Sequence, residues 1–367
     1  MKIYKVNLEP LDWFFFGGEK TFDNSVRQSY IAHSNKFPQQ TALLGMIRYQ
    51  LLKQKGLLFE KNKVSDLESV SDLIGNDSFM MGVPNQSFGA IERLSPVFLE
   101  KKMLQSKEEI GYLSAPLTRN CKISFDNQAK VYINGQIKCM LINDNNTFEP
   151  KPYDSSSYID KNGKTLNEND IFVKRMQIGI TKNTDSDSAN AKDDGFYKRE
   201  MIKFKSDGKQ NFYYSFYVSI DNSKIELVSD YDYVFLGAER SCFKMTVKDL
   251  QIDEPSKLPH LFVKNLFAGD KSLDGKILLL SHTYVKDIDK LNSICNFHWS
   301  SQIPFRNITR TSDGNLNSGD VAYIRKDACY QMLCAGSVLY FDEKDRAEVE
   351  NLLNDNHMQK IGYNYYK

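Results

Sequence analysis

The chain has 367 residues, 41% of them hydrophobic and 26% charged, a composition typical of a soluble globular protein with a large buried core. Its length makes two domains the starting expectation, and its many tyrosines and phenylalanines favour sheet-rich structure. The formal net charge of +1 excludes a strong global field, so any contact with nucleic acid has to come from local patches.

Cysteine usage and apolar runs indicate the compartment. The six cysteines form no C-x-x-C pair and are too dispersed for a disulfide scaffold, which predicts reduced and mostly buried thiols. Glu9, Pro10 and Asp12 interrupt any signal-peptide core, and runs such as 277–280 are too short to span a bilayer. We therefore expect a cytoplasmic protein without membrane contact.

The first elements are a strand and a helix. Residues 2–8 alternate as a strand does, and Pro10 ends it. The apolar run 13–16 is closed by two glycines and predicts a buried turn or a short strand. Pro38 then precedes residues 42–52, where apolar side chains recur at helical spacing.

The next segments are shorter and more polar. They predict a helix over 57–82, short strands over 86–98 and 112–116, two strands around the Asn134-Gly135 turn, and a polar loop or insertion over 143–169.

Residues 171–204 predict a long β-hairpin, on which the functional interpretation depends. Its two arms alternate apolar and polar residues, and its polar tip has no aliphatic residue larger than alanine. The arms carry six basic residues: Lys174, Arg175, Lys182, Lys198, Arg199 and Lys203. A hairpin with cationic arms can grip a polyanion, although a solvated surface hairpin would have the same composition.

The second half repeats a mixture of strands and helices. We expect strands at 211–220, 225–228, 233–245, 276–284, 335–341 and 359–365, an amphipathic helix at 342–354, and a linker marked by Pro255 and Pro259. Residues 305–320 are polar and contain glycine. The alternation predicts an α+β protein with two similarly built units.

Motifs of catalysis and metal binding are absent from the sequence. We find no Walker loop, no G-x-G-x-x-G, no H-E-x-x-H and no G-x-S-x-G, so we expect no enzyme activity, cofactor or metal. His33 lies in a polar loop where a general base could operate, but a lone histidine is more often structural. The carboxylates Asp185 and Asp187 lack the glycine and glutamate of a calcium loop.

Two further features could hold phosphate. The helix start near Pro38 offers backbone amides beside Lys36, Gln39, Gln40 and Thr41, although taken alone an ordinary capped helix explains it better. The turn 237–241 offers amides and Arg240, although a plain hairpin turn would have this composition too. The aromatic strand 212–217 lacks the RRM signature, which assigns its rings to the core.

Five segments in order along the chain resemble one family. Residues 8–17, LEPLDWFFFG, are similar to an L-x-P-L-D-x-x-F-F opening, and 37–48, FPQQTALLGMIR, to an F-P-x-x-x-A-L-x-G-x-x-R helix. The hairpin segments 178–180 and 195–197 look like the family's G-I … G-x-L-Y pattern. Residues 236–240, LGAER, and 335–338, AGSV, resemble an L-G-G-E-R turn and a late A-G-S-V strand. The family is the third subunit of the Cmr complex, the type III-B CRISPR effector, within the RAMP superfamily.

The resemblance implies two ferredoxin-like (RRM-like) domains with a protruding β-hairpin thumb: residues 1–250 with the thumb at about 171–204, and residues 251–367. It implies a non-catalytic subunit of an antiviral ribonucleoprotein that binds the 5′ tag of the CRISPR RNA. The partners would be the large polymerase-like subunit and the backbone RAMP subunits, with target RNA contacted indirectly.

The residues expected to contact RNA combine these sources. Carried over by position, Arg48 and the Gln39-Gln40 helix start line the tag groove, while the Gly237 turn holds phosphate with one departure, Ala238 in place of the usual second glycine. The full set is Lys36, Gln39, Gln40, Thr41, Arg48, Lys174, Arg175, Ile178, Ile180, Thr181, Lys182, Lys198, Arg199, Gly237, Ala238 and Arg240. Two alternatives stay open: a metal-independent CRISPR RNA endoribonuclease that uses His33, and a purely protein-binding scaffold.

Overall fold

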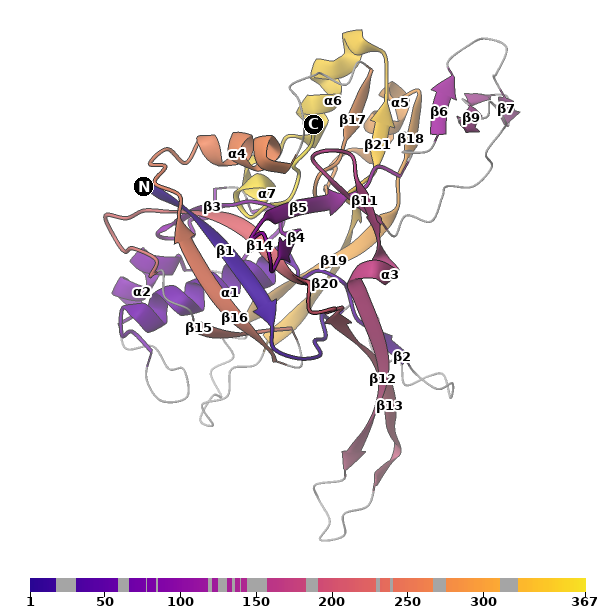
Figure 1. Cartoon of the computed structure of the whole chain (residues 1–367). Helices are drawn as coiled ribbons and strands as arrows, with labels where there is room; N and C mark the ends of the chain where they lie inside the picture. Colours follow the sequence, from indigo (N-terminus) through magenta and orange to yellow (C-terminus); the bar gives the residue numbers. More distant parts are fainter. Residues whose placement is uncertain are drawn as a thin grey trace.

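A computed structural model gives the arrangement of the chain (Figure 1). It describes residues 1–17, 31–58, 66–76, 78–83, 85–117, 121–124, 131–133, 136–138, 140–143, 157–182, 191–228, 232–237, 240–266, 275–310 and 323–367.

A nine-stranded antiparallel sheet organises the N-terminal two-thirds of the chain. β14 (Gln210–Ile220) and β1 (Lys2–Pro10) lie at its centre and pair over seven residues, from Lys2 opposite Ile220 to Leu8 opposite Tyr214. The remaining strands are β3 (Ile91–Leu94), β4 (Phe98–Met103), β5 (Glu109–Ser114), β10 (Ser157–Asp160), β11 (Thr165–Asn167), β15 (Asp232–Leu236) and β16 (Ser241–Asp249).

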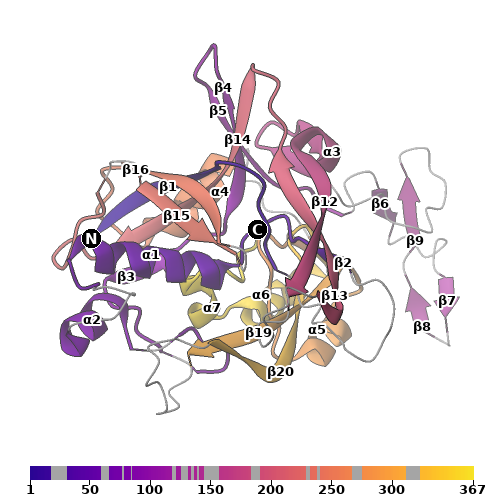
Figure 2. The same cartoon turned by 90° about the horizontal axis from the view of Figure 1, so that it is seen from below.

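The helix α1 (Gln40–Gln54) packs on one face of this sheet. Its buried residues Leu43, Ile47 and Leu51 recur at helical spacing and join the largest apolar cluster of the protein. Figure 2 shows α1 running alongside β15, β16 and β1, with the short helix α2 (Leu67–Ile74) beyond one end. The helix predicted at 42–52 is therefore confirmed, and its apolar face is buried as its periodicity indicates.

A separate three-stranded sheet forms the thumb. β12 (Phe172–Lys182) and β13 (Ala191–Phe204) are antiparallel, and β2 (Ile31–His33) joins β13 in parallel. In Figure 1 the β12–β13 hairpin extends well away from the body, starting at α3 (Glu168–Ile171). The predicted long hairpin is confirmed, while the pairing with β2 has no signal in the sequence.

The C-terminal part contributes a second, smaller layer. It holds β17 (Lys276–Leu278), β18 (Phe297–Trp299) and β21 (Val338–Tyr340), with the long hairpin of β19 (Gln302–Arg310) and β20 (Tyr323–Leu333). Its helices are α4 (Lys257–Leu266), α5 (Ile288–Ile294), α6 (Arg346–Leu353) and α7 (Asn356–Lys360), with a 3-10 turn at Glu343–Asp345. Two small antiparallel pairs stand apart: β6 (Cys121–Ser124) with β9 (Met140–Asn143), and β7 (Val131–Ile133) with β8 (Gln136–Lys138).

Several local predictions are wrong. Residues 359–365 form the end of α7 and a turn instead of a strand, because Asp355 caps the helix by accepting hydrogen bonds from the amides of His357 and Met358. The expected linker at Pro259 lies inside the first turn of α4, where proline is tolerated. The expected loop 143–169 contains β10 and β11, and the expected strand 225–228 is irregular.

The mixed α+β class with a large antiparallel sheet is established by these elements. Within the described residues, no group of three or more His, Cys, Asp or Glu side chains could hold a metal ion. No helix in the described ranges is both long enough and apolar enough to cross a membrane.

Candidate nucleic-acid interface

The thumb presents two different faces. Residues opposite each other in an antiparallel pair share a face, so Lys174, Met176 and Ile178 lie together with Glu200 and Lys198. The other face carries Arg175, Gln177, Arg199 and Lys203. The side chains of Ile180, Thr181 and Lys182 are outside the described part, although their backbone continues β12.

The base of the thumb is fixed to the body by the segment 13–16. Phe14 and Ile202 exchange backbone hydrogen bonds of 2.8 and 2.9 Å. The rings of Phe172 and Phe204 stack with centroids 5.4 Å apart. Phe14 is fully buried, and its ring centroid lies 5.6 Å from that of Phe204. The guanidinium of Arg175 lies 4.5 Å from the ring centroid of Trp13. Arg175, predicted to bind RNA, is therefore already engaged in a cation–π contact within the protein.

Acidic residues pair with the cations at the thumb base. The carboxylate of Glu168, 8% exposed, forms an ion pair with Lys36 and lies 3.5 Å from the ammonium of Lys174. Lys174 is also 3.7 Å from Glu200. On the opposite face Lys203 lies 3.3 Å from Asp12, and the Trp13 amide and this ammonium hold the pKa of Asp12 below its usual value. The base is therefore charge-compensated, which the sequence pattern of basic arms does not predict.

Beyond this base, the face that carries Lys174 becomes apolar and exposed. Met176 is 46% exposed and Ile178 is 64% exposed. Lys198, also exposed, lies directly opposite Ile178. An exposed apolar pair beside a lysine can insert between bases while the ammonium contacts phosphate.

His33 lies at the edge of this face. It pairs in register with Glu200, and its Nδ1 is 3.6 Å from the Glu200 carboxylate. Its side chain is 56% exposed. An exposed histidine beside a carboxylate is the arrangement that the endoribonuclease alternative would need, although an ordinary surface ion pair has the same geometry.

The start of α1 is enclosed instead of open. Gln39 is the N-cap residue without a side-chain cap, while Gln40 is 4% exposed and donates from Nε2 to the Ser95 carbonyl at 2.9 Å. The hydroxyl of the buried Tyr363 is hydrogen-bonded to the Gln40 backbone, and burial raises the pKa of this tyrosine. The structure therefore does not place Gln40 where solvent-exposed phosphate would reach it.

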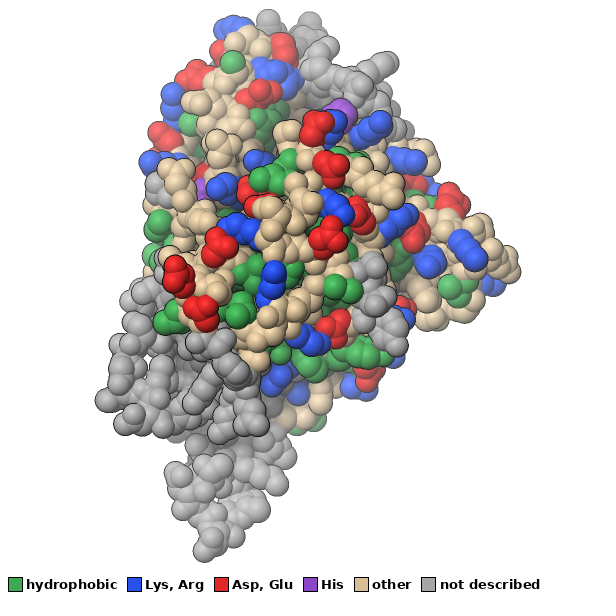
Figure 3. Space-filling model, turned by 90° about the vertical axis from the view of Figure 1, so that its left-hand side faces the viewer, with side chains coloured by type: hydrophobic (Ala, Val, Ile, Leu, Met, Phe, Trp, Pro, Cys, Tyr) green, Lys and Arg blue, Asp and Glu red, His purple; other side chains and the backbone are tan. Residues whose placement is uncertain are grey.

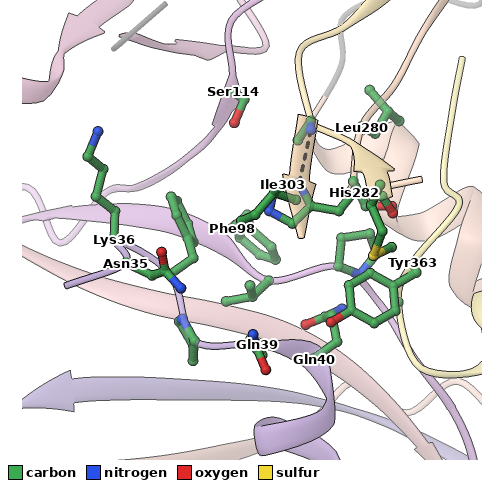
Figure 4. Close-up of a pocket in the computed structure, with 18 of the residues that line it drawn as sticks. Asn35, Lys36, Gln39, Gln40, Phe98, Ser114, Leu280, His282, Ile303 and Tyr363 are labelled. Atoms are coloured by element: carbon green, nitrogen blue, oxygen red, sulfur yellow. Dashed lines mark hydrogen bonds between the residues drawn. The ribbon is translucent and has the colours of Figure 1, made fainter. Parts of the chain in front are cut away.

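A cavity of about 230 Å³ adjoins this helix start, between the large sheet and the C-terminal part (Figure 4). Asn35, Lys36 and Gln39 line one side, and His282 and Tyr363 line the other. Burial lowers the pKa of His282 to about 4, so the ring is neutral at pH 7 and its Nδ1 accepts a hydrogen bond from the Ala335 amide at 3.2 Å.

The Gly237 turn adjoins the segment that anchors the thumb. A Cβ at Gly237 would lie 2.2 Å from the Phe15 carbonyl oxygen, and the Phe15 amide donates to Ser241 Oγ at 3.1 Å. Arg240 is exposed, has a positive φ of 50°, and lies 5.1 Å from the ring centroid of Phe235. Ala238 is outside the described residues.

Arg48 and Thr41 complete the predicted set. Thr41 is half-buried in the first turn of α1. The Arg48 guanidinium lies 5.3 Å from the ring centroid of Phe88, a buried residue whose ring stacks with His357. The structure thus brings the thumb base, Lys36 and the Gly237 turn together through residues 13–16, and it places Arg48 with the aromatic group that precedes β3.

Sequence reasoning missed three participants. Met176 was detectable, because it alternates with Lys174 and Ile178 on one strand face. Trp13 lies in the N-terminal segment 8–17, but its contact with Arg175 has no signal in the sequence. Glu168 had no signal, because its pairing with Lys36 joins positions 132 residues apart.

One family model matches part of the chain. Residues 6–135, about a third of the chain, match the family model described as "CRISPR-associated protein (Cas_Cmr3)". No curated protein matches the chain.

Two solved chains are similar over nearly the whole length. One comes from a structure described as type III-B Cmr-beta bound to cognate target RNA and AMPPnP, with 14% identity, a TM-score of 0.49, and coverage of 98% of this chain and 94% of that one. The other, type III-B Cmr-beta bound to cognate target RNA, has 15% identity, a TM-score of 0.48, and coverage of 98% and 95%. Over its N-terminal third, the chain is therefore similar to the Cas_Cmr3 family of CRISPR-associated proteins.

Proposed function

We propose that the chain is the CRISPR RNA-binding subunit of a type III-B effector, the Cmr complex, without catalytic activity of its own. It holds the 5′ tag of the CRISPR RNA and bridges the large polymerase-like subunit to the backbone RAMP subunits. Target RNA is contacted indirectly, within a cytoplasmic ribonucleoprotein. Its two units, residues 1–250 and 251–367, are ferredoxin-like domains, and the thumb belongs to the first.

The observation that carries the proposal is the exposed face of the thumb. Met176 and Ile178 are apolar side chains on a strand that projects from the body, where water contact costs free energy unless a partner covers them. Lys198 lies beside them. Extended RNA offers both partners at once, because bases cover the apolar side chains while phosphates approach the ammonium group.

The anchoring of the thumb supports the same function. A thumb that inserts between bases needs a rigid base. The backbone hydrogen bonds between Phe14 and Ile202 and the buried Phe172–Phe204 pair fix that base in the core. RNA contact therefore falls on the distal part, where the hairpin leaves these contacts.

The test uses the complete complex carrying a doubly substituted chain, Lys182→Glu with Lys198→Glu. We expect weaker retention of CRISPR RNA and a flatter dependence on salt, with the slope reduced by about 0.7 to 0.9 for each lost phosphate contact. The matched control is Lys257→Glu on α4, a 57% exposed lysine at the end of the molecule away from the thumb tip. Unchanged RNA affinity and slope in the double variant would refute the role of the thumb.

The endoribonuclease alternative is separated by a second measurement. Purified protein is incubated with CRISPR repeat RNA in the presence of EDTA. We expect no specific cleavage, and cleavage that disappears in His33→Ala would replace our proposal with a metal-independent nuclease that uses the His33–Glu200 pair.

The scaffold alternative is decided by crosslinking in the assembled complex. We expect photoreactive groups at positions 176 and 178 to crosslink to RNA. Crosslinks from both positions to protein alone would favour a thumb that contacts a neighbouring subunit.

A further inference from the structure

Two connected turns project beyond the end of the large sheet. One joins β4 to β5, and the other joins β13 to β14. They lie side by side, because the Leu104 amide donates a hydrogen bond to the Lys209 carbonyl at 3.0 Å. Figure 2 shows the ends of β4, β5 and β14 extending away from the rest of the sheet. We name residues 101–109 and 205–210, all of which the structure describes, the cationic prong.

The prong carries five lysines without a carboxylate partner. Lys107, Lys205 and Lys209 are exposed, and Lys101 and Lys102 are half-buried. Among the described residues none of the five belongs to an ion pair, whereas the lysines at the thumb base do. In Figure 3 the prong is the projection at the right-hand side, with basic side chains around its tip. These ammonium groups are therefore available to an anion.

The acidic residues of the prong do not cancel this charge. Oδ1 of Asp207 accepts hydrogen bonds from the Lys209 amide at 2.9 Å and from the next amide at 3.1 Å, and these amides hold the pKa of Asp207 below its usual value. The Glu109 carboxylate lies 3.0 Å from the ammonium of Lys5, a residue outside the prong. Glu108 is the third acid, so five lysines stand against three acids, two of which already have partners.

The composition of the prong favours a phosphate backbone over a protein surface. Protein interfaces are depleted in lysine and rely on aromatic and arginine anchors. The prong has neither, and Leu104, 43% exposed, is its one large exposed apolar side chain. A lysine ammonium on a flexible stem meets phosphate as a point charge, whatever base that phosphate carries.

The position of the prong relates it to the strand held by the thumb. β13 carries Lys198 beside the exposed apolar pair of the thumb, ends at Phe204, and leads directly into Lys205 of the prong. At the usual rise of an extended strand, about 23 Å separates Lys198 from Lys205. The Lys205 amide also donates to the Ile171 carbonyl at 2.7 Å, which fixes the prong to the root of the thumb.

We propose that the cationic prong binds the phosphate backbone of the CRISPR RNA without reading its bases, as a second contact beyond the thumb. The inference rests on the proposed function, because it takes the thumb to hold this RNA. The apolar side chains of the thumb contact bases, and the lysines of the prong add an affinity that depends on salt and is equal for every sequence. No lysine of the prong belongs to the set of RNA-binding residues predicted from the sequence.

The first experiment is photocrosslinking in the complete complex purified from its native cell. The photoreactive amino acid p-azidophenylalanine replaces Gln105 at the exposed tip of the prong, or Lys286, an exposed residue before α5, as the control. We expect position 105 to crosslink to CRISPR RNA before any target RNA is added, and position 286 not to. Crosslinks from position 105 to protein alone, RNA crosslinks that require target RNA, or no crosslinks would overturn the proposal.

The second experiment removes charge from the three exposed lysines, with Lys107→Gln, Lys205→Gln and Lys209→Gln combined in one chain. Each lost phosphate contact contributes about fourfold at about 0.15 M salt, so RNA binding should weaken roughly 50-fold and the salt slope should fall by about 2 to 3. The matched triple change to arginine keeps the charge and should keep both values. Lys286→Gln should change neither, and thermal unfolding of each variant checks that the fold is intact.

Two comparisons separate this inference from the proposed function. The thumb variant Lys182→Glu with Lys198→Glu is measured in parallel. Unchanged affinity and slope in the triple glutamine variant, with both lowered in the thumb variant, would overturn the prong and leave the thumb. The triple variant is also measured with a scrambled 5′ tag, where we expect the same factor of loss. A loss confined to the native tag would show that the prong reads bases and would overturn the proposal.

Discussion

Replacement of Gly237 by alanine tests whether the turn and the thumb anchor are mechanically coupled. Gly237 has a φ of +80°, and an added Cβ would lie 2.2 Å from the Phe15 carbonyl oxygen and 3.3 Å from its carbon. Neither side can give way easily, because the Phe15 amide donates to Ser241 and Phe14 is bonded to Ile202 on both sides. The clash is therefore between two backbone segments.

The expected cost has two parts. An alanine in the left-handed region costs about 1–2 kcal/mol, and forcing packed groups apart costs about 1–3 kcal/mol. Gly208→Ala is the matched control, because Gly208 has a φ of +72° and its Cβ would meet nothing within 4 Å. Alanine lowers the conformational entropy of the unfolded chain by the same amount in both variants, so this effect cancels in the comparison. Gly237→Ala should therefore be the less stable by about 1–3 kcal/mol.

The assay is urea unfolding of both variants and the parent chain, analysed with a common dependence on denaturant. Hydrogen exchange adds a local readout, because the Ile202 amide donates to the Phe14 carbonyl at 2.9 Å and should exchange faster in Gly237→Ala alone. Equal stability losses in the two variants, with unchanged exchange at Ile202, would show that the turn does not press on the anchor.

Three further predictions concern the core and the thumb base. Glu168→Gln leaves Lys36 and Lys174 without their shared carboxylate. It should lower the free energy of unfolding by only about 1–2 kcal/mol, because both lysines are more than a third exposed and partly screened by water. The control is Glu254→Gln, in the exposed pair with Lys257, which should leave the urea midpoint nearly unchanged. Phe14→Ala empties a fully buried site and should cost about 3–5 kcal/mol, whereas Phe235→Ala at an exposed site should change unfolding by less than about 0.5 kcal/mol. Because burial lowers the pKa of His282 from 6.5 to about 4, the unfolded chain takes up the proton first, so stability should fall by about 1–3 kcal/mol as pH drops from 6.5 to 4. His282→Asn should remove this part of the pH dependence in urea titrations at several pH values.

The elements with strong local periodicity were predictable from the sequence. The helix within 42–52, the first strand and the long hairpin are confirmed, because their periodicity is strong and their ends carry proline or a polar tip. The alternating residues 359–365 predict a strand, but the cap at Asp355 begins the short helix α7 there instead. The sequence does not predict β19 and β20, because residues 305–320 are polar. Their pairing joins residues distant in sequence, such as Gln302 and Leu333, and has no local signal.

The candidate site was predictable only in part. The sequence predicts a hairpin with basic arms, and the hairpin is confirmed, while the pairing register adds that Lys174 and Ile178 share a face. The enclosure of Gln40 was not predictable, because it depends on Ser95 and Tyr363, which are distant in sequence and bond to it only after folding. The pairing of thumb cations with Glu168 and Glu200 was hidden for the same reason.

This pairing changes how a nearly neutral protein should bind RNA. The sequence shows six cations on the hairpin arms, yet Lys174 already has two carboxylates nearby, Lys203 has Asp12, and Arg175 lies over Trp13. A lysine that is already paired with a carboxylate neutralises less phosphate charge, so fewer counterions leave the RNA when the protein binds. The thumb's part of the salt slope should therefore report the exposed distal cations, with Lys198 among them, and stay well below the value that six free cations would give. The affinity of the thumb then depends more on the apolar contacts of Met176 and Ile178, which salt does not screen.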